Sequence, residues 1–180
     1  MKTLVVFDFD DTLFESGAMI GVKKSGSEKR YLSSHEYASY TPSEDEEFDY
    51  EQFQSYPPNP QPIDNSTQKF HSSVGNHGIN NVIILTARDN ATPVREVLEN
   101  FGMPPVKIIT IGSSNPEHKA DVVENLVNEK KYDRVVVYED SSANIAAIRK
   151  RLKPAMINFI AFKVTANPRG GRLQKEMKLK

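Results

Sequence analysis

The sequence predicts an α/β protein, with a Rossmann-like, mainly parallel five-stranded sheet and helices on both of its faces. Two observations predict this fold. Strand-like and helix-like apolar patterns alternate from residue 63 to residue 164, as in chains that build a parallel sheet through helical crossovers. The chain also begins with the near-continuous apolar run 4–7, which is typical of a strand buried on both faces.

The first strand runs straight into the acidic residues Asp8, Asp10 and Asp11. Residues i and i+2 of an extended chain point to the same side, so Asp8 and Asp10 are expected to leave the strand side by side. Neighbouring carboxylates repel each other unless one is protonated or a cation lies between them. The pair therefore indicates a cation site, and the alternative is a polar turn that happens to be acidic.

Residues 14–33 are expected to form a β-hairpin instead of the helix that normally follows a first parallel strand. Segments 18–24 and 29–32 flank a turn-rich centre around Gly26. The functional interpretation is a flap over the acidic pair, and the alternative is a loose surface ribbon.

Residues 34–62 are the least regular part of the chain and complete a small insertion, 14–62. We expect a helical turn over 35–40, a solvated acidic run at 44–47, a short helix within 49–56 and then a proline-rich extended link. Aromatic residues are frequent here. They either anchor the insertion to the domain or line a substrate site.

Regular elements follow from residue 63. Helices are expected from Asn65 or Ser66 to about residue 77, over 93–101 with a stop at Gly102, over 117–130 and over 142–152. Strands are expected over 82–85, 106–111, 134–138 and 156–164. Residues 1–165 then form one catalytic domain with the insertion 14–62, and 166–180 form a basic tail, expected to be a flexible end or a short helix.

The composition excludes several classes of protein. The chain has 180 residues, a net charge of −1 and no cysteine, which rules out disulfides, thiolate catalysis and zinc sites that need sulfur. No signal peptide and no apolar run of about 18 residues is expected. We therefore expect a cytoplasmic protein with no membrane association and no obligate protein partner.

The carboxyl ends of the expected strands carry the remaining polar residues. Parallel strands bring these ends to one crevice. The residues expected there are Asp8, Asp10, Thr86, Arg88, Lys119, Glu139 and Asp140.

This set of groups suits phosphoryl transfer. Carboxylate oxygens bind Mg²⁺, which Asp140 can share with Asp8. An ionised Asp is a nucleophile towards phosphoryl groups, and a second carboxylate can protonate the leaving oxygen and then activate water. Thr86 and Lys119 can hold and neutralise the phosphate, with Arg88 as a further substrate-binding residue. The alternative for Lys119 is an ordinary solvated lysine in the first turn of a helix.

These residues resemble the motifs of the haloacid dehalogenase (HAD) superfamily of phosphohydrolases. The stretch from Asp8 to Leu13 resembles the first motif, DxDxT; Thr86 resembles the second and Lys119 the third. Glu139 and Asp140, with Asn144, resemble the acidic fourth motif. The resemblance covers residues 1–33 and about 63–164, and the motifs are also similar to those of bacteriophage and nucleic-acid-repair phosphatases.

The resemblance implies a fold of the HAD type, with Asp8 as nucleophile and Asp10 as general acid and base. It implies Mg²⁺ held by Asp8, the backbone carbonyl of Asp10 and Asp140, with Glu139 or Asn144 completing the site. The insertion stands where the family places its flap and cap. It is too short for a large helical cap, so an open site for a bulky phosphorylated substrate is implied.

The sequence therefore predicts a Mg²⁺-dependent phosphatase that hydrolyses a phosphomonoester through an aspartyl-phosphate. Its partner is a phosphorylated substrate, either a small molecule such as a nucleotide or a nucleic-acid end. Two other classes stay open: a receiver-like signalling module, although no Asp follows the expected third strand at Ile111, and a phosphate-binding protein without catalysis.

Overall fold

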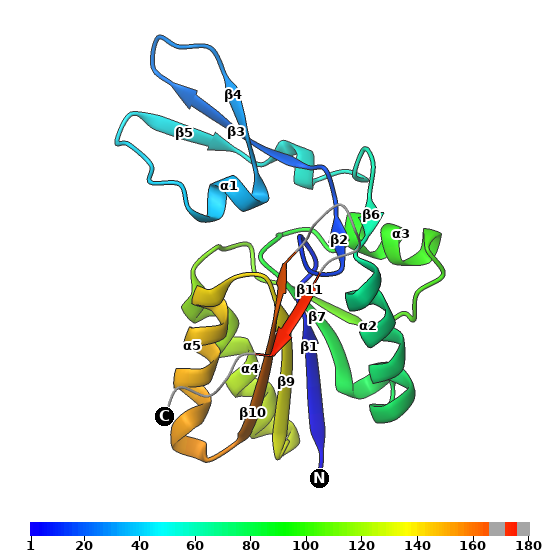
Figure 1. The fold of residues 1–180 in the computed structure, drawn as a ribbon. Coiled ribbons are helices and arrows are strands. Elements are labelled where there is room, and N and C mark those ends of the chain that lie inside the picture. The colour runs from blue at the N-terminus through cyan, green and yellow to red at the C-terminus, as the bar shows by residue number, and fades with distance from the viewer. Residues whose placement is uncertain (166–171, 176–180) are drawn as a thin grey trace.

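The computed structural model describes residues 1–165 and 172–175. A six-stranded sheet forms its centre (Figure 1). In chain order the strands are β1 (Thr3–Phe7), β7 (Val82–Thr86), β8 (Lys107–Thr110), β9 (Arg134–Glu139), β10 (Asn158–Thr165) and β11 (Arg172–Lys175). Five strands are parallel, in the order β10-β9-β1-β7-β8, and β11 pairs with β10 in the antiparallel direction. The expected α/β fold with a five-stranded parallel sheet is confirmed.

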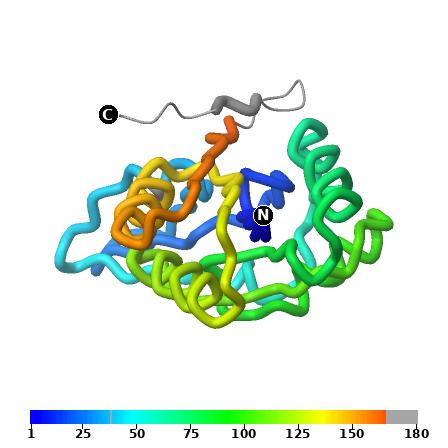
Figure 2. The backbone as a smooth tube through the Cα atoms, turned by 90° about the horizontal axis from the view of Figure 1, so that it is seen from below, coloured from blue at the N-terminus to red at the C-terminus, as the bar shows by residue number. Residues whose placement is uncertain are grey.

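Helices cover both faces of this sheet, as the view along the strands shows (Figure 2). They are α2 (Asp64–His77), α3 (Thr92–Asn100), α4 (Pro116–Lys130) and α5 (Ser142–Leu152), with short 3₁₀ turns η2 (Ile79–Asn81) and η3 (Lys153–Ala155). One apolar cluster packs α4 and α5 against one face, and a second packs α2 and α3 against the other. All five residues of β1 are buried, as the apolar run of this strand predicts.

β1 lies at the point where the order of the strands reverses. It pairs with β7 on one side and with β9 on the other, and α4 carries the chain from β8 at one edge back to β9. Ligands of open α/β sheets bind at the carboxyl ends of strands beside such a point. The residues that follow β1, β7 and β9 therefore lie at the same edge of the sheet.

Residues 14–62 form a small module beyond these strand ends (Figure 1). Its elements are β2 (Phe14–Glu15), β3 (Met19–Lys24), β4 (Arg30–Ser33), α1 (Ser34–Ala38), β5 (Glu46–Asp49), η1 (Glu51–Phe53) and β6 (Gln61–Pro62). β3 and β4 form the expected hairpin, and β2 pairs with β6 where the chain leaves and rejoins the sheet domain.

The strand β5 was not expected within the acidic run 44–47, although Glu44, Asp45 and Glu47 are exposed, as expected of a solvated run. It pairs with β3, and this register sets Glu47 opposite Lys23 and Glu46 opposite Lys24. Opposite charges directly across an antiparallel pair stabilise it, so the acidic residues suit a strand whose partner is basic. The three-stranded order is β4-β3-β5.

The aromatic residues of the module pack mainly on one another. The ring of Tyr37 on α1 meets the rings of Phe48 and Tyr50 edge-on at 5.4 and 6.0 Å, and the Tyr37 and Tyr50 hydroxyls are 2.7 Å apart. For these three rings the structure shows anchoring within the insertion. Tyr31 is 48% exposed on β4.

Two boundaries differ from expectation. Helix α2 has Ile63 at its N-cap without a side-chain hydrogen bond, so Asn65 and Ser66 lie inside the helix. Residues 172–175 of the tail form β11, neither a flexible end nor a helix, because β10 would otherwise present an unpaired edge. The expectations for 166–171 and 176–180 lie outside the described residues. Among the helices that are described, none combines the length and apolarity needed to cross a membrane.

Candidate functional site

Asp8 is the first residue beyond β1 and lies at the centre of the site. Its backbone N–H donates to the Tyr138 carbonyl oxygen at 3.0 Å, which extends the pairing of β1 with β9. Its carboxylate accepts hydrogen bonds on both oxygens, from Lys119 Nζ to Oδ1 at 2.9 Å and from Thr12 Oγ1 to Oδ2 at 3.1 Å. The carboxylate is therefore buried and held in one orientation.

Lys119 comes from the first turn of α4, which Asn115 caps by accepting the Glu117 N–H. Only 3% of Lys119 is exposed, and Nζ also donates to Glu139 Oε2 at 2.8 Å. Burial alone would lower the pKa of Lys119, but the charges of Asp8 and Glu139 raise it above its ordinary value. Lys119 is thus a buried, charged ammonium and not a solvated surface lysine.

Three carboxylates gather around this ammonium. Oxygen atoms of Asp8, Glu139 and Asp140 lie within 4.8 Å of one another. Burial raises the pKa of Asp8, with the charge of Glu139 adding to the effect. Burial and the charges of Asp8 and Glu139 also raise the pKa of Asp140 to about 11. Burial opposes ionisation of Glu139 too, but the Lys119 ammonium lowers its pKa overall. One ammonium does not balance three carboxylates, so the cluster suits a further cation.

Thr12 connects two members of the cluster, and the sequence reasoning did not single it out. Its hydroxyl lies 3.1 Å from Asp8 Oδ2 and 3.4 Å from Asp140 Oδ1, and the residue is fully buried. The signal was available, because Thr12 is the last residue of the DxDxT pattern. A hydroxyl with no solvent contact is placed to hold the two acids in fixed positions.

The side chain of Asp10 has partners different from those of Asp8. Arg88 donates from Nε to Asp10 Oδ2 and from an Nη atom to Oδ1, both at 2.8 Å, and Ser16 Oγ donates to Oδ1 at 3.0 Å. The two carboxylates that were expected to lie side by side therefore have different cationic partners: Asp8 pairs with Lys119, and Asp10 pairs with Arg88. The Asp10 carboxylate is not in the cluster of Asp8, Glu139 and Asp140.

Arg88 is enclosed by protein groups. Its side chain is 2% exposed, and its guanidinium lies over the rings of Phe9 and Phe53, at 5.3 and 4.7 Å from their centres. A further N–H donates to the Phe53 carbonyl oxygen at 3.2 Å. Arg88 was expected to bind substrate, whereas these contacts direct it towards Asp10 and the insertion.

Thr86 and Asn144 lie at the end of β7 and in the first turn of α5. Thr86 is the last residue of β7 and is 1% exposed, and its hydroxyl accepts the Arg88 backbone N–H at 3.2 Å. Asn144 lies in the first turn of α5, where its backbone N–H donates to Ser141 Oγ at 3.2 Å. Of Glu139 and Asn144, Glu139 is the residue whose carboxylate lies with those of Asp8 and Asp140.

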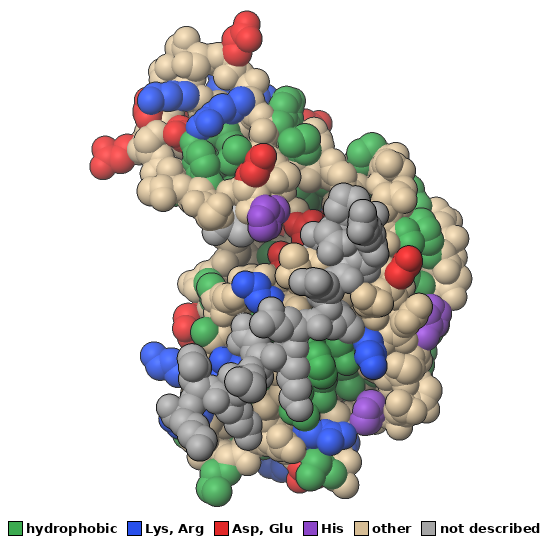
Figure 3. Space-filling model, in the orientation of Figure 1, with side chains coloured by type: hydrophobic (Ala, Val, Ile, Leu, Met, Phe, Trp, Pro, Cys, Tyr) green, Lys and Arg blue, Asp and Glu red, His purple; other side chains and the backbone are tan. Residues whose placement is uncertain are grey.

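Asp11 connects the acidic stretch to the small module. Its backbone is left-handed, with φ at 61°, and its carboxylate accepts a hydrogen bond from the Ser34 hydroxyl at the start of α1. Burial raises the pKa of Asp11. The space-filling view shows a deep notch between the module and the sheet domain (Figure 3), so the module stands beside an open face.

Comparison with protein families gives one match. The family described as "Protein of unknown function (DUF2608)" matches residues 1–104. The chain belongs to the DUF2608 family. No curated protein and no solved structure matches the chain.

The DUF2608 match covers only some residues of the candidate site. Asp8, Asp10, Thr86 and Arg88 lie inside the matched residues, as does the whole insertion. Lys119 and the acidic pair that ends β9 lie beyond them. The fold joins the two parts, because β1 is paired with β9.

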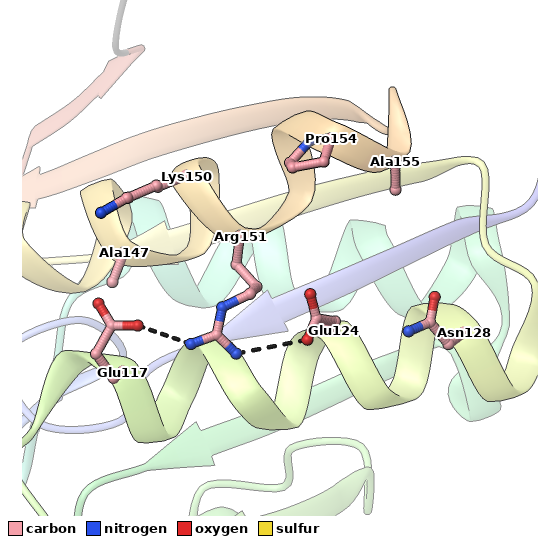
Figure 4. A pocket seen from close by; sticks show the side chains of 8 residues that line it. All are labelled: Glu117, Glu124, Asn128, Ala147, Lys150, Arg151, Pro154 and Ala155. Carbon is pink, nitrogen blue, oxygen red and sulfur yellow. Dashed lines mark hydrogen bonds and ion pairs between the residues drawn. The ribbon is translucent and has the colours of Figure 1, made fainter.

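A surface groove of about 470 Å³ lies between α4 and α5, away from the cluster (Figure 4). Arg151 of α5 lines it and pairs with Glu117 at 2.7 Å, with Glu124 at 3.5 Å and with Asp121. With three acidic partners, Arg151 offers little net positive charge to an anion. The ion pairs instead fasten α5 to α4, the helix that carries Lys119.

Proposed function

We propose that this chain is a phosphatase of the HAD type, which hydrolyses a phosphomonoester through an aspartyl-phosphate on Asp8 and depends on Mg²⁺. The observation that carries the proposal is the arrangement of Asp8. Its carboxylate is buried at a strand end, fixed by Lys119 and Thr12, and lies within 4.8 Å of two further carboxylates. An ion pair that only stabilises the fold needs one carboxylate for each ammonium, whereas three carboxylates lie close to Lys119 here.

In the first step an Asp8 carboxylate oxygen attacks phosphorus. The bond from phosphorus to the ester oxygen breaks, and that oxygen leaves with a proton supplied by the Asp10 carboxyl group. In the second step water attacks the phosphorus of the aspartyl-phosphate and gives a proton to Asp10. Inorganic phosphate leaves, and Asp8 and Asp10 return to their starting states.

The carboxylate cluster fits Mg²⁺. Its donors are hard oxygens, which Mg²⁺ prefers, and its acids exceed its one ammonium. Asp8 and Asp140 would hold the ion together with the backbone carbonyl of Asp10, while Glu139 is occupied by Lys119 and by the Ser141 N–H at 3.1 Å. When bound, the ion neutralises charge so that a phosphate dianion can approach.

Lys119 and Thr86 are the residues of this chain that would hold the phosphoryl oxygens. Lys119 already lies 2.9 Å from the proposed nucleophile, so its charge acts where negative charge builds up during transfer. Thr86 ends the strand next to β1 and offers a hydroxyl. Positioning and charge neutralisation are the main contributions that phosphoryl transfer needs.

The insertion bears on the class of substrate. Residues 14–62 contain nine acidic and four basic residues, so the module beside the site is negatively charged. A nucleic acid is a polyanion that proteins bind through basic groups. The charge of the module therefore favours a small phosphate ester or a phosphorylated protein over a nucleic-acid end.

The test is hydrolysis of p-nitrophenyl phosphate by the purified full chain. We expect turnover with MgCl₂, none with excess EDTA and none for Asp8→Asn. Asp45→Asn, on an exposed loop of the module, is the matched control and should keep full activity. Full activity of Asp8→Asn would overturn the mechanism. Phosphate binding without turnover in any condition would instead support a non-catalytic phosphate-binding protein.

A further inference from the structure

We propose that Arg88 is a positioning residue that couples the insertion to Asp10. Its guanidinium orients the Asp10 carboxylate, and Phe53 of η1 fixes the guanidinium from the other side. The inference rests on the proposed function, because it concerns the group that exchanges protons with the leaving oxygen and with water.

The contact between Arg88 and Asp10 is a two-point fork. Nε donates to Oδ2 and an Nη atom donates to Oδ1, both at 2.8 Å. A planar fork fixes the plane of a carboxylate as well as its position, which a single hydrogen bond or a lysine ammonium does not do. Arg88 therefore determines the direction in which the Asp10 oxygens point.

The two oxygens of Asp10 are not equivalent. Among the described residues, Oδ1 accepts from two donors, Arg88 and Ser16, whereas Oδ2 accepts from one, Arg88. Because each carboxylate oxygen has two lone pairs, Oδ2 keeps a free position. The geometry assigns to Oδ2 the proton that passes to the leaving ester oxygen and that is later taken from water.

Arg88 is poorly placed to bind a phosphate itself. Its guanidinium lies over the rings of Phe9 and Phe53. Three of its donors are used by Asp10 and by the Phe53 carbonyl. An arginine that bound substrate would present its fork to the open face of the site.

The position of η1 is fixed by several contacts around Phe53. The Gln54 side-chain amide donates to Asp89 Oδ1 at 2.5 Å, and the Asn90 amide donates to the Gln54 carbonyl at 3.5 Å. On its other side, the Met19 N–H donates to Gln52 Oε1 at 2.9 Å. The loop after β7 and the start of β3 thus both hold η1. A shift of the insertion would move Phe53, and with it the partner of Asp10.

The test compares two leaving groups. p-Nitrophenolate is a good leaving group that needs little protonation, whereas the alkoxide of β-glycerophosphate needs a proton from Asp10. We expect Arg88→Ala to lower kcat/KM for β-glycerophosphate by about 50-fold or more and kcat/KM for p-nitrophenyl phosphate by less than about 5-fold, because kcat/KM reports the step in which the ester oxygen leaves and not the later hydrolysis of the common aspartyl-phosphate. Inhibition by inorganic phosphate, which reports phosphate binding, should change by less than about 3-fold.

Matched variants separate this role from a general loss of structure. Arg88→Lys keeps the charge without the fork and should be intermediate between the wild type and Arg88→Ala. Arg95→Ala, on the exposed side of α3, should have no effect. In an Asp10→Asn background, Arg88→Ala should not lower kcat/KM for phenyl phosphate any further. A residue that acts only by orienting the Asp10 carboxylate has no effect once that carboxylate is absent.

The role of the insertion is tested at Phe53. Phe53→Leu keeps an apolar side chain but removes the ring beneath the guanidinium. As in Arg88→Ala, activity should fall more with β-glycerophosphate than with p-nitrophenyl phosphate, but the loss should be smaller. Tyr31→Ala, an exposed aromatic of the same module, is the control. Thermal melting of each variant identifies any that fail to fold.

The outcomes are distinct. Equal losses of kcat/KM on both substrates, with weaker inhibition by phosphate, would show that Arg88 binds the phosphate and would overturn the inference alone. An additive loss in the Asp10→Asn background would do the same. No turnover of either substrate by the wild type would overturn the proposed function, and the inference with it.

Discussion

Lys119 and Asp8 form a buried ion pair, with Nζ 2.9 Å from Oδ1, although 111 residues separate them in the chain. The same ammonium contacts Glu139 at 2.8 Å. Lys119 is the cation that the structure supplies to Asp8 and Glu139. The acids of the site depend on it, because each of them is buried or partly buried.

Removal of the Lys119 charge is expected to destabilise the protein. Lys119→Met preserves the length of the side chain but leaves buried carboxylates without their partner, which costs about 3–5 kcal/mol in comparable buried pairs. Urea unfolding at pH 7.5 in EDTA measures the change in the free energy of unfolding. Lys130→Met, at the exposed end of the same helix, should change it by less than about 0.5 kcal/mol.

Asp8→Asn should reduce the cost of Lys119→Met, because one of the acids that the lysine balances is then neutral. Equal costs in both backgrounds would mean that the ion pair with Asp8 contributes nothing specific. Loss of the interaction with Glu139 would then account for the whole effect.

The acidic cluster also predicts how stability depends on pH. The pKa of Asp140 is raised to about 11 and that of Asp8 is raised as well, so between about pH 5 and pH 9 the folded protein keeps a proton that the unfolded chain has lost. The free energy of unfolding therefore falls as pH rises, by up to about 1.4 kcal/mol per pH unit for one proton. The lowered pKa of Glu139 affects the free energy of unfolding only below this pH range, and the raised pKa of Lys119 affects it only above this range.

Urea unfolding of the metal-free protein at pH 6, 7, 8 and 9 measures this slope. Asp140→Asn should flatten it and be more stable than the wild type at pH 9. Saturating MgCl₂ should flatten it in the wild type, since a bound cation replaces the proton. A slope that is unchanged in Asp140→Asn would assign the proton to another group.

The succession of strands and helices along the chain could be predicted because apolar periodicity is a local property of the sequence. β1 is apolar at every position but Thr3 and is followed by Asp8, and β7 is followed by Arg88, so their placement at one edge needs only the rule for parallel sheets. The expectation that Asp8, Lys119, Glu139 and Asp140 meet follows from the same rule. Each lies at the end of a strand or at the start of the helix after it.

The separation of Asp10 from Asp8 could not be predicted in this way. The chain leaves the extended conformation after β1, and Asp11 takes a left-handed φ of 61°. The Asp10 carboxylate then pairs with Arg88. The position of Arg88 depends in turn on Phe53, 35 residues away. Contacts through an irregular insertion have no local period in the sequence. The strand β5 was missed for a related reason, because its charged residues are stabilised only by a partner strand.

The charge of the insertion predicts which phosphate esters are turned over. Nine acidic residues against four basic ones should repel an oligonucleotide, so at low salt we expect p-nitrophenyl phosphate and mononucleotides to react faster than 3′- or 5′-phosphorylated 12-mers. Added salt screens repulsion between exposed charges, so raising NaCl from 20 to about 200 mM should narrow the difference. Phosphate release across this panel measures both effects. An oligonucleotide that reacts fastest at low salt, and loses affinity as salt rises, would show the counterion release of nucleic-acid binding. That result would establish a nucleic-acid end as the substrate despite the acidic module.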